Sequence, residues 1–279
     1  MSNVINKKDL AEKLAEEFGC SKKDATAYVQ FVFDTVADTL KDNGTVDVFG
    51  FCKFSISERA ARTGINPATK EKIEIAKHLD KLRVDAIEFA PLQDEKTDTL
   101  LIKTISSLVR NSTVALPVSL NAASIETSWN AIKQAAHPRL IVSVPTSPIQ
   151  MAYTCQKKAP AVLEMISSLV AQAKEFCPEV GFAAEDAARS EIDFLTAAME
   201  AAISAGATMI TICDTAGTMM PDEFKTFIEE LYHRVPTLSQ IVLSVQCADA
   251  LNVAAACSIQ AVQAGAANIK ASSSSGTYA

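Results

Sequence analysis

From residue 70 onward the chain alternates helical stretches with seven short runs rich in β-branched residues. The runs are apolar along most of their length, which is typical of strands in a parallel sheet that is covered by helices. Seven such units favour a closed (β/α)₈ barrel over an open sheet. In chain order the runs are VDAIEFA, STVALPVSL, RLIVSVPTS, VGFAAED, TMITICDT, QIVLSVQC and ANIKASS.

The first seventy residues have a different order of elements. Asn6 is placed to cap a helix that ends at Gly19, and Ser21 with Asp24 resembles a capping box at the start of a second helix. After Gly44, alternation and aromatic content favour strands. We therefore predict a small α+β domain at 1–69, followed by an α/β barrel of the TIM type at 70–279.

Residues 58–88 can be interpreted in two ways. The first half is an extended ribbon with turn signals at Gly64 and at Asn66-Pro67, whereas the second half has the apolar spacing of an amphipathic helix. Residues 70–76 fit either a descending strand of the ribbon or the first helix of the barrel. We favour the helix, because its period continues without a breaker to Leu82.

Charge and composition limit the classes of function. The net charge is −7, and the first 77 residues contain 12 Lys and Arg against 12 Asp and Glu, so the negative charge belongs to the remainder. A polar N-terminus and the lack of a long apolar run predict a cytoplasmic protein with no membrane partner. The seven Cys are scattered without a C-x-x-C pair, which predicts free thiols.

Two strings near the N-terminus, NKKDLAEKLAEEFGCSKKDA and VFGFCKFSISERAARTGINP, resemble the HU/IHF family of bacterial nucleoid proteins over about residues 3–76. The resemblance implies an intertwined homodimer that clamps bent DNA between two β-arms, and hence a nucleoid-associated protein. By the same resemblance, Arg59 and Arg62 contact the groove or phosphates, and Asn66-Pro67 forms the intercalating tip.

Several departures from that family predict weak binding. Ser57 and Ile65 stand where the family usually has Arg, and the neutral charge of the segment means that few counterions are released from DNA. A helical interpretation of 70–76 also shortens the arm. The alternative is a simple hairpin with exposed Arg side chains.

The rest of the chain, from about Lys70 to Ile269, resembles 2-isopropylmalate synthase and the homocitrate synthases. The motifs are KEKIEIAKHLDKLRVDAIE, PTSPIQMAYTCQKKAPAVLEMISSLVAQAKE, FAAEDAARSEIDFLTAAMEAAISAGATMITICDTAGTMMPDEF and SVQCADALNVAAACSIQAVQAGA. The resemblance implies an acyltransferase that condenses acetyl-CoA with a 2-oxo acid, with a divalent metal (Mg²⁺, Mn²⁺ or Zn²⁺) polarising the oxo acid.

The metal ligands that this family supplies are absent. Gln246 and Ala248 stand in place of a His-x-His pair, and Asp249 replaces an Asn. The Arg-Asp-Gly-Glu-Gln loop of the first strand is missing, so the barrel is incomplete unless Phe54–Ser57 substitutes for that strand and brings Glu58 near the lost Asp. We expect no cofactor, and metal with acetyl-CoA only if the enzyme hypothesis holds.

A set of polar residues remains at the predicted carboxyl ends of the strands. The resemblance implies that several of them hold the oxo acid or orient catalytic groups. The alternative is structural: Asp186 and Arg189 form an ion pair at a helix start, and Asp214-Thr215 caps the following loop. The set is Thr146, Ser147, Glu185, Asp186, Arg189, Asp214 and Thr215, with Gln150 at a position where the family usually has His.

The leading hypothesis is a DNA-binding module fused to a degenerate, non-catalytic barrel. The alternative is an active acyltransferase with altered ligands, and a third possibility is a recombined or truncated gene product. His78, His137 and His233 show no metal-ligand spacing and are expected on the surface.

Overall fold

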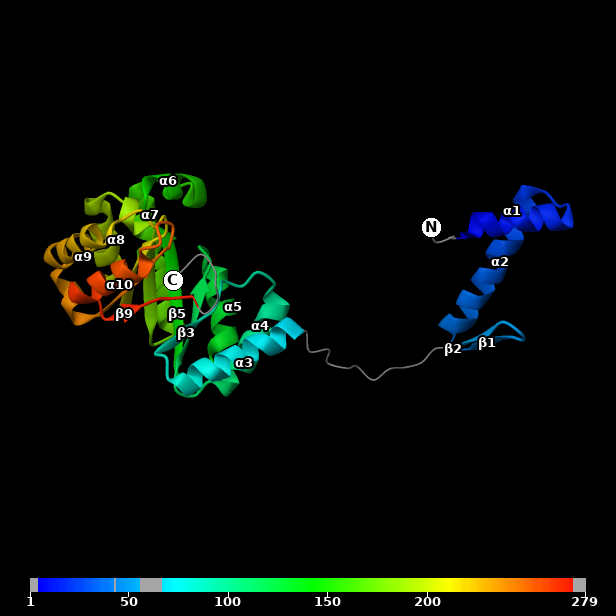
Figure 1. The fold of residues 1–279 in the computed structure, drawn as a ribbon, viewed down its shortest axis with the longest axis horizontal. Coiled ribbons are helices and arrows are strands. Elements are labelled where there is room, and N and C mark those ends of the chain that lie inside the picture. The colour runs from blue at the N-terminus through cyan, green and yellow to red at the C-terminus, as the bar shows by residue number, and fades with distance from the viewer. Residues whose placement is uncertain (1–4, 43, 56–66, 273–279) are drawn as a thin grey trace. The chain divides into compact units, whose positions relative to one another are not determined.

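The computed structural model describes residues 5–42, 44–55 and 67–272 (Figure 1). The chain divides into two compact units, Met1–Gly64 and Ile65–Ala279, and each is described by itself. No helix in the described ranges is both long and apolar enough to cross a membrane.

The first unit contains a helical hairpin followed by a β-hairpin. Helix α1 spans Lys7–Phe18, α2 spans Lys22–Lys41, and β1 (Thr45–Val48) pairs antiparallel with β2 (Cys52–Ser55). Asn6 and Asp9 form the reciprocal capping box of α1, and Gly19 ends this helix with a left-handed φ of 65°. The helix boundaries predicted from the capping residues are confirmed.

The core of the first unit is very small. Its buried apolar residues are Ala11, Ala15, Ala25 and Val29. The aromatic side chains of α2 and the β-hairpin lie outside this core: Phe31 is 72% exposed, Phe49 is fully exposed and Phe51 is 81% exposed. Within one copy of this unit, these three aromatic side chains are therefore left mostly exposed to solvent.

The second unit is built on a seven-stranded parallel sheet whose strand order follows the chain order, from β3 to β9. Its strands are β3 (Ala86–Glu88), β4 (Thr113–Val118), β5 (Pro138–Pro145), β6 (Val180–Glu185), β7 (Met209–Asp214), β8 (Val242–Cys247) and β9 (Asn268–Ile269). A sequential parallel order is that of a (β/α) barrel. In the described ranges β3 and β9 are the two edges of the sheet, so the barrel is incomplete, with seven strands curled into part of a circle.

Helices connect these strands in the βα pattern predicted from the sequence (Figure 1). They are α3 (Pro67–Leu82), α4 (Glu95–Leu108), α5 (Ala122–Ile132), α6 (Pro148–Gln150), α7 (Ala159–Phe176), α8 (Ile192–Ser204), α9 (Pro221–Arg234) and α10 (Ala254–Gln263). A π-helical turn at Met151–Cys155 follows α6, and short 3₁₀ turns lie at Ala187–Arg189 and Pro236–Gln240.

Residues 70–76 are helical, as the sequence analysis favoured, and they belong to the second unit. Ala76 is buried in the large core of that unit. Asp80, four residues further along α3, accepts hydrogen bonds from the backbone N–H groups of Asn111 and Ser112, both at 2.8 Å. These bonds fix the end of α3 to the loop before β4, which leaves no descending arm strand in this stretch.

The proposed substitute for the first barrel strand is not seen. Phe54 and Ser55 pair with Val46 and Thr45 within the β-hairpin of the first unit. In the described ranges β2 belongs to a two-stranded sheet with β1 and is not a member of the parallel sheet. Glu58 lies outside the described residues.

The two faces of the parallel sheet have different surroundings. On β5, Leu140, Val142 and Val144 belong to the large core. Ile141, between them, joins a separate cluster with Ala115, Ala183 and Cys213 on the neighbouring strands. Because side chains alternate along a strand, this second cluster defines the inner face of the curled sheet. The inner face is lined here by small apolar residues.

Candidate functional site

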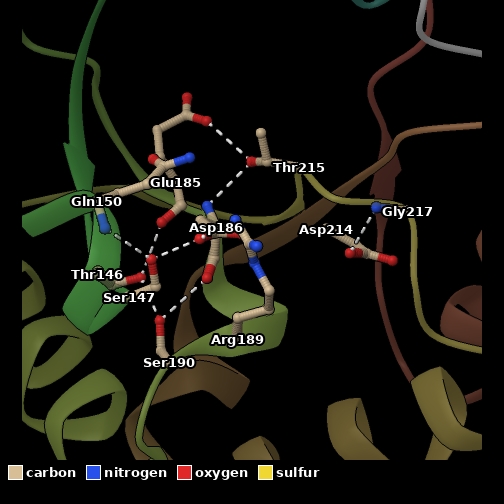
Figure 2. A network of polar contacts seen from close by, with 10 residues as sticks. All are labelled: Thr146, Ser147, Gln150, Glu185, Asp186, Arg189, Ser190, Asp214, Thr215 and Gly217. Carbon is tan, nitrogen blue, oxygen red and sulfur yellow. Dashed lines mark hydrogen bonds and ion pairs between the residues drawn. The ribbon is translucent and has the colours of Figure 1, made fainter. Parts of the chain in front are cut away.

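The polar residues singled out in the sequence follow three neighbouring strands and meet at their carboxyl ends (Figure 2). Thr146 and Ser147 follow β5, Glu185 and Asp186 lie at the end of β6, and Asp214 ends β7. Parallel strands that are adjacent in the sheet bring these ends together, and this is the edge where (β/α) barrels carry their sites.

Asp186 is the centre of the network. Its side chain is fully buried and accepts hydrogen bonds from Ser147 Oγ at 2.5 Å and from Arg189 Nη2 at 2.7 Å and Nε at 2.8 Å. Its backbone has a left-handed φ of 59°, and its N–H donates to Thr215 Oγ1 at 3.0 Å. Such a carboxylate, paired and hydrogen-bonded on both oxygens, holds the loop after β6 in one conformation.

Thr146 bonds one backbone carbonyl and one hydroxyl, and Asp214 bonds backbone N–H groups. Thr146 Oγ1 donates to the Glu185 carbonyl at 3.0 Å and accepts from Ser190 Oγ at 2.8 Å. Asp214 accepts from the Gly217 N–H at 3.0 Å and from the Met219 N–H at 3.4 Å, so it caps the loop after β7. The contacts of the structural alternative are therefore present for both carboxylates.

Glu185 differs from Asp186 and Asp214, because its carboxylate accepts hydrogen bonds from two hydroxyls, one on β5 and one directly after β7. Oε1 accepts from Ser143 Oγ at 2.6 Å, and Oε2 accepts from Thr215 Oγ1 at 3.3 Å. Ser143 alternates with the core residues Val142 and Val144 and therefore lies on the inner face. Glu185 thus presents a positioned carboxylate near that face.

A second pair on the inner face was not singled out from the sequence. Lys270 Nζ lies 2.6 Å from Glu88 Oε1, and the two residues come from the ends of β9 and β3. Burial raises the pKa of Glu88, although Lys270 acts in the opposite direction. Burial would lower the pKa of Lys270, but the charge and hydrogen bond of Glu88 outweigh it and raise this pKa. The available signal was a charged residue within the first and within the last apolar run.

The residues at the implied metal positions do not fit a divalent cation. Gln246 is buried, and its Oε1 accepts a weak hydrogen bond from Cys213 Sγ at 3.9 Å. Asp249 is occupied in accepting the Ala254 N–H at 2.9 Å, and Ala248 offers no side-chain ligand. In the described residues no group of three or more His, Cys, Asp and Glu side chains is arranged to hold a metal. Oxygen and imidazole donors must converge for such a site, and among the described side chains they do not.

The remaining predicted positions are scattered. The Gln150 N–H donates to Ser147 Oγ at 3.3 Å, which caps the turn of α6. His78, His137 and His233 are exposed, as predicted. Cys177, Cys213, Cys247 and Cys257 are buried free thiols, and burial raises the pKa of Cys247 to about 12. A thiol with so high a pKa is a poor nucleophile at neutral pH.

The structure places little of the predicted DNA contact set. Arg59, Arg62 and Asn66 lie outside the described residues. Pro67 is the first residue of α3, a position that suits its fixed φ and missing N–H.

The fold and the polar network define the second unit as an incomplete (β/α) barrel with its polar residues at the carboxyl ends of the strands. The chain belongs to the HMGL-like family, whose model matches residues 60–274. The model of the bacterial DNA-binding proteins matches residues 5–81, so the first unit is HU-like. The two matches overlap on α3, the segment that the sequence analysis also assigned to both families.

Curated relatives include 2-isopropylmalate synthases and a related plant enzyme. The synthase of Carboxydothermus hydrogenoformans is 39% identical over 207 residues, which cover 74% of this chain and 41% of the relative. Methylthioalkylmalate synthase 1-1 of Eutrema japonicum, a chloroplast protein, is 38% identical over 76% of this chain and 43% of its own length. The chain thus spans about two fifths of the length of these relatives.

Solved structures with a similar fold include HMG-CoA lyases. The Bacillus subtilis enzyme aligns with a TM-score of 0.62 at 18% identity, covering 73% of this chain and 70% of its own. The Acinetobacter baumannii enzyme, solved with coenzyme A and 3-methylmalate, aligns with a TM-score of 0.58 at 14% identity, covering 73% and 67%. These similarities establish the barrel-type fold.

Proposed function

We propose that this chain is a homodimeric, HU-like DNA-binding protein whose barrel unit does not carry out the acetyl-CoA condensation. The roles divide at about residues 1–69 and 70–279. The chain would act in the cytoplasm, associated with the nucleoid, and DNA contacts would come from Arg59, Arg62 and the Asn66-Pro67 pair.

The observation that carries the dimer is the mismatch between the core of the first unit and its aromatic residues. A core of three Ala and one Val leaves Phe31, Phe49 and Phe51 largely in water. Burying a Phe side chain is worth about 2 kcal/mol, so a surface with several exposed Phe is strongly favoured to associate. In a two-fold interface, a second copy of the chain covers this surface with the same apolar residues.

DNA binding by this unit is expected to be weak and to decrease steeply with salt. The neutral charge of the first 77 residues limits the number of phosphates that the unit can neutralise. A gel-shift series on nicked, bent and linear duplexes at several salt concentrations tests this proposal. Tight binding that salt does not weaken would contradict it.

The barrel side of the proposal is supported by the site residues. The implied ligand positions hold Gln246, Ala248 and an Asp249 that bonds to backbone, while Asp186 and Asp214 stabilise loops. We infer that neither acetyl-CoA nor a divalent metal is a cofactor of this chain. The test is thiol release from acetyl-CoA in the presence of several 2-oxo acids, with and without Mg²⁺ or Mn²⁺.

A second candidate function is the acyltransferase activity of the 2-isopropylmalate synthase type. It is favoured by the 39% identity to such a synthase and by the positioned Glu185 carboxylate. In that case Thr146, Ser147, Arg189 and Thr215 would help to hold the oxo acid. Thiol release that requires both an oxo acid and added metal would establish this candidate and overturn the non-catalytic proposal.

A further inference from the structure

Lys270 places a cationic group on the inner face of the sheet. In the pairing of β8 with β9, Val245 lies opposite Ile269 and belongs to the large core, so the next position along each strand lies on the opposite, inner face. Glu88 pairs in register with Ala115, a member of the inner cluster. The Lys270–Glu88 pair therefore lies over the small apolar residues of the inner face.

Both members of the pair have hydrogen-bonding capacity left. An ammonium group has three N–H donors, and the described residues provide one acceptor for Lys270, Glu88 Oε1. For Glu88 Oε2 the described part of the chain provides no partner. The side chains are 32% and 21% exposed, respectively, so a small molecule can reach them.

The charges near this pair favour an uncharged ligand. Glu185 interacts electrostatically with both Glu88 and Lys270, and Arg139, which also acts on Glu88, is itself paired with Glu179 at 2.8 Å. The three carboxylates therefore outnumber the two cations. An anionic ligand would be repelled by this excess of negative charge, whereas a neutral carbonyl compound needs only a hydrogen-bond donor for its oxygen.

We propose that Lys270 and Glu88 form a metal-independent acid–base pair that exchanges the α-protons of small, uncharged carbonyl compounds. Lys270 Nζ donates a hydrogen bond to the carbonyl oxygen, and Glu88 Oε2 takes the proton from the adjacent carbon. The electron pair of the broken C–H bond forms the C=C bond of an enolate while the C=O pair moves to the oxygen, whose negative charge the Lys270 ammonium group stabilises. The protonated Glu88 exchanges its proton with solvent, and return of a proton or deuteron from it to carbon restores the carbonyl compound, so no oxidant or co-reactant is consumed.

In this site the Lys270 ammonium group takes the place of a metal ion as the group that polarises the carbonyl oxygen. The residues at the metal positions implied by the resemblance do not converge on a cation, whereas Lys270 supplies a fixed positive charge on the same inner face. A hydrogen-bond donor aimed at a developing oxyanion and a carboxylate base with a raised pKa are the two groups that enolisation needs. This proton exchange depends neither on DNA binding by the first unit nor on whether the barrel condenses acetyl-CoA with an oxo acid.

The test is hydrogen–deuterium exchange followed by proton NMR. The full chain is incubated in D₂O with EDTA and hydroxyacetone as the neutral probe, and with pyruvate as the anionic comparison. We expect hydroxyacetone to lose its α-proton signals faster than in buffer alone and faster than pyruvate does. The variants Lys270→Met and Glu88→Gln should each lower the enzyme-dependent rate at least about tenfold, because general acid–base groups commonly contribute that much or more. Lys174→Met, on the surface of the same unit, is the matched control and should leave the rate unchanged.

Three outcomes would overturn the proposal: no exchange above the buffer rate, exchange that Lys270→Met leaves unchanged, or exchange that appears only with added Mg²⁺ or Mn²⁺. If Lys270→Met does not fold by circular dichroism, Glu88→Gln decides. That variant keeps an acceptor for Lys270 and removes only the basic carboxylate, so an unchanged rate in it would also refute the proposal.

Discussion

Glu88 and Lys270 are 182 residues apart in sequence, yet their side chains are joined by a hydrogen-bonded ion pair of 2.6 Å. Glu88 ends β3 and Lys270 follows β9, so the pair connects the two edge strands of the open sheet. In the described part of the chain, β3 and β9 do not pair directly with each other. The ion pair therefore ties the first and last strands of the curled sheet together.

Removal of this tie is expected to destabilise the second unit. In Lys270→Met the mostly buried Glu88 carboxyl loses its partner, and we expect the free energy of unfolding to fall by about 1–2 kcal/mol at pH 7. The partial exposure of both side chains keeps the effect below that of a fully buried pair. Urea unfolding measures it, with Lys96→Met, at an exposed lysine of the same unit, as the control. Equal stabilities of Lys270→Met and the native chain would show that the pair is not a structural tie.

Asp80 is predicted to make the stability of the second unit depend on pH. Burial would raise the pKa of Asp80, but the backbone N–H groups of Ser112, Asn111 and Arg110 outweigh it and lower this pKa. A carboxyl group with a lowered pKa in the folded state contributes stability above its unfolded pKa, near 3.9, and loses it as pH falls through the folded value.

The variant Asp80→Asn tests this contribution. It should lower the free energy of unfolding by about 2 kcal/mol at pH 7, because the NH₂ group of Asn is itself a donor and cannot accept the backbone N–H bonds that the Asp80 carboxylate accepts. The difference from the native chain should shrink as the pH falls below about 4. The exposed Asp85→Asn is the control for a loss of charge alone. A difference that stays constant from pH 7 to pH 3 would show that the Asp80 charge is not responsible.

Gly217 is expected to tolerate no side chain. Its φ is 61°, and a Cβ added there would overlap with the Ala248 carbonyl oxygen, which belongs to the next loop and cannot move like a side chain. Gly217→Ala should therefore cost more than the roughly 1 kcal/mol of a positive-φ alanine, about 2–4 kcal/mol. Gly206→Ala is the matched control, since its φ is also positive and its neighbour is the flexible Lys174 side chain. Equal melting temperatures for the two variants would contradict the close approach of these loops.

Self-association of the full chain is expected to depend on the aromatic residues of the first unit. Light scattering at micromolar concentration should give a mass of two chains, and Phe31→Asp should shift it toward one chain, because a charge would be buried in the apolar contact. Tyr153→Ser, which alters an exposed aromatic residue of the second unit, should have no effect. A native mass of one chain would remove the dimer and most of the argument for DNA clamping.

Local patterns in the sequence predicted much of the architecture. Asn6, Gly19 and Ser21 fixed the boundaries of the first two helices, because capping uses side chains within a few residues of the helix end. The seven apolar runs all became parallel strands, and the uninterrupted period to Leu82 correctly favoured a helix at 70–76. The polar residues after β5, β6 and β7 were singled out through the resemblance to the synthases, and the structure brings them together because consecutive parallel strands lie side by side.

Other features depended on contacts between distant parts of the chain. The strand pattern of Phe54–Ser57 is equally compatible with a hairpin and with a barrel strand, and only the pairing of β2 with β1 decided between them. Likewise, the sequence shows Glu88 and Lys270 as two isolated charges within two apolar runs. The curl of the sheet brings them within hydrogen-bonding distance, because its sequential strand order returns β9 toward β3. The sequence by itself determined the elements and their order, whereas the open edge and the charge pair across it were decided by tertiary packing, which no local pattern encodes.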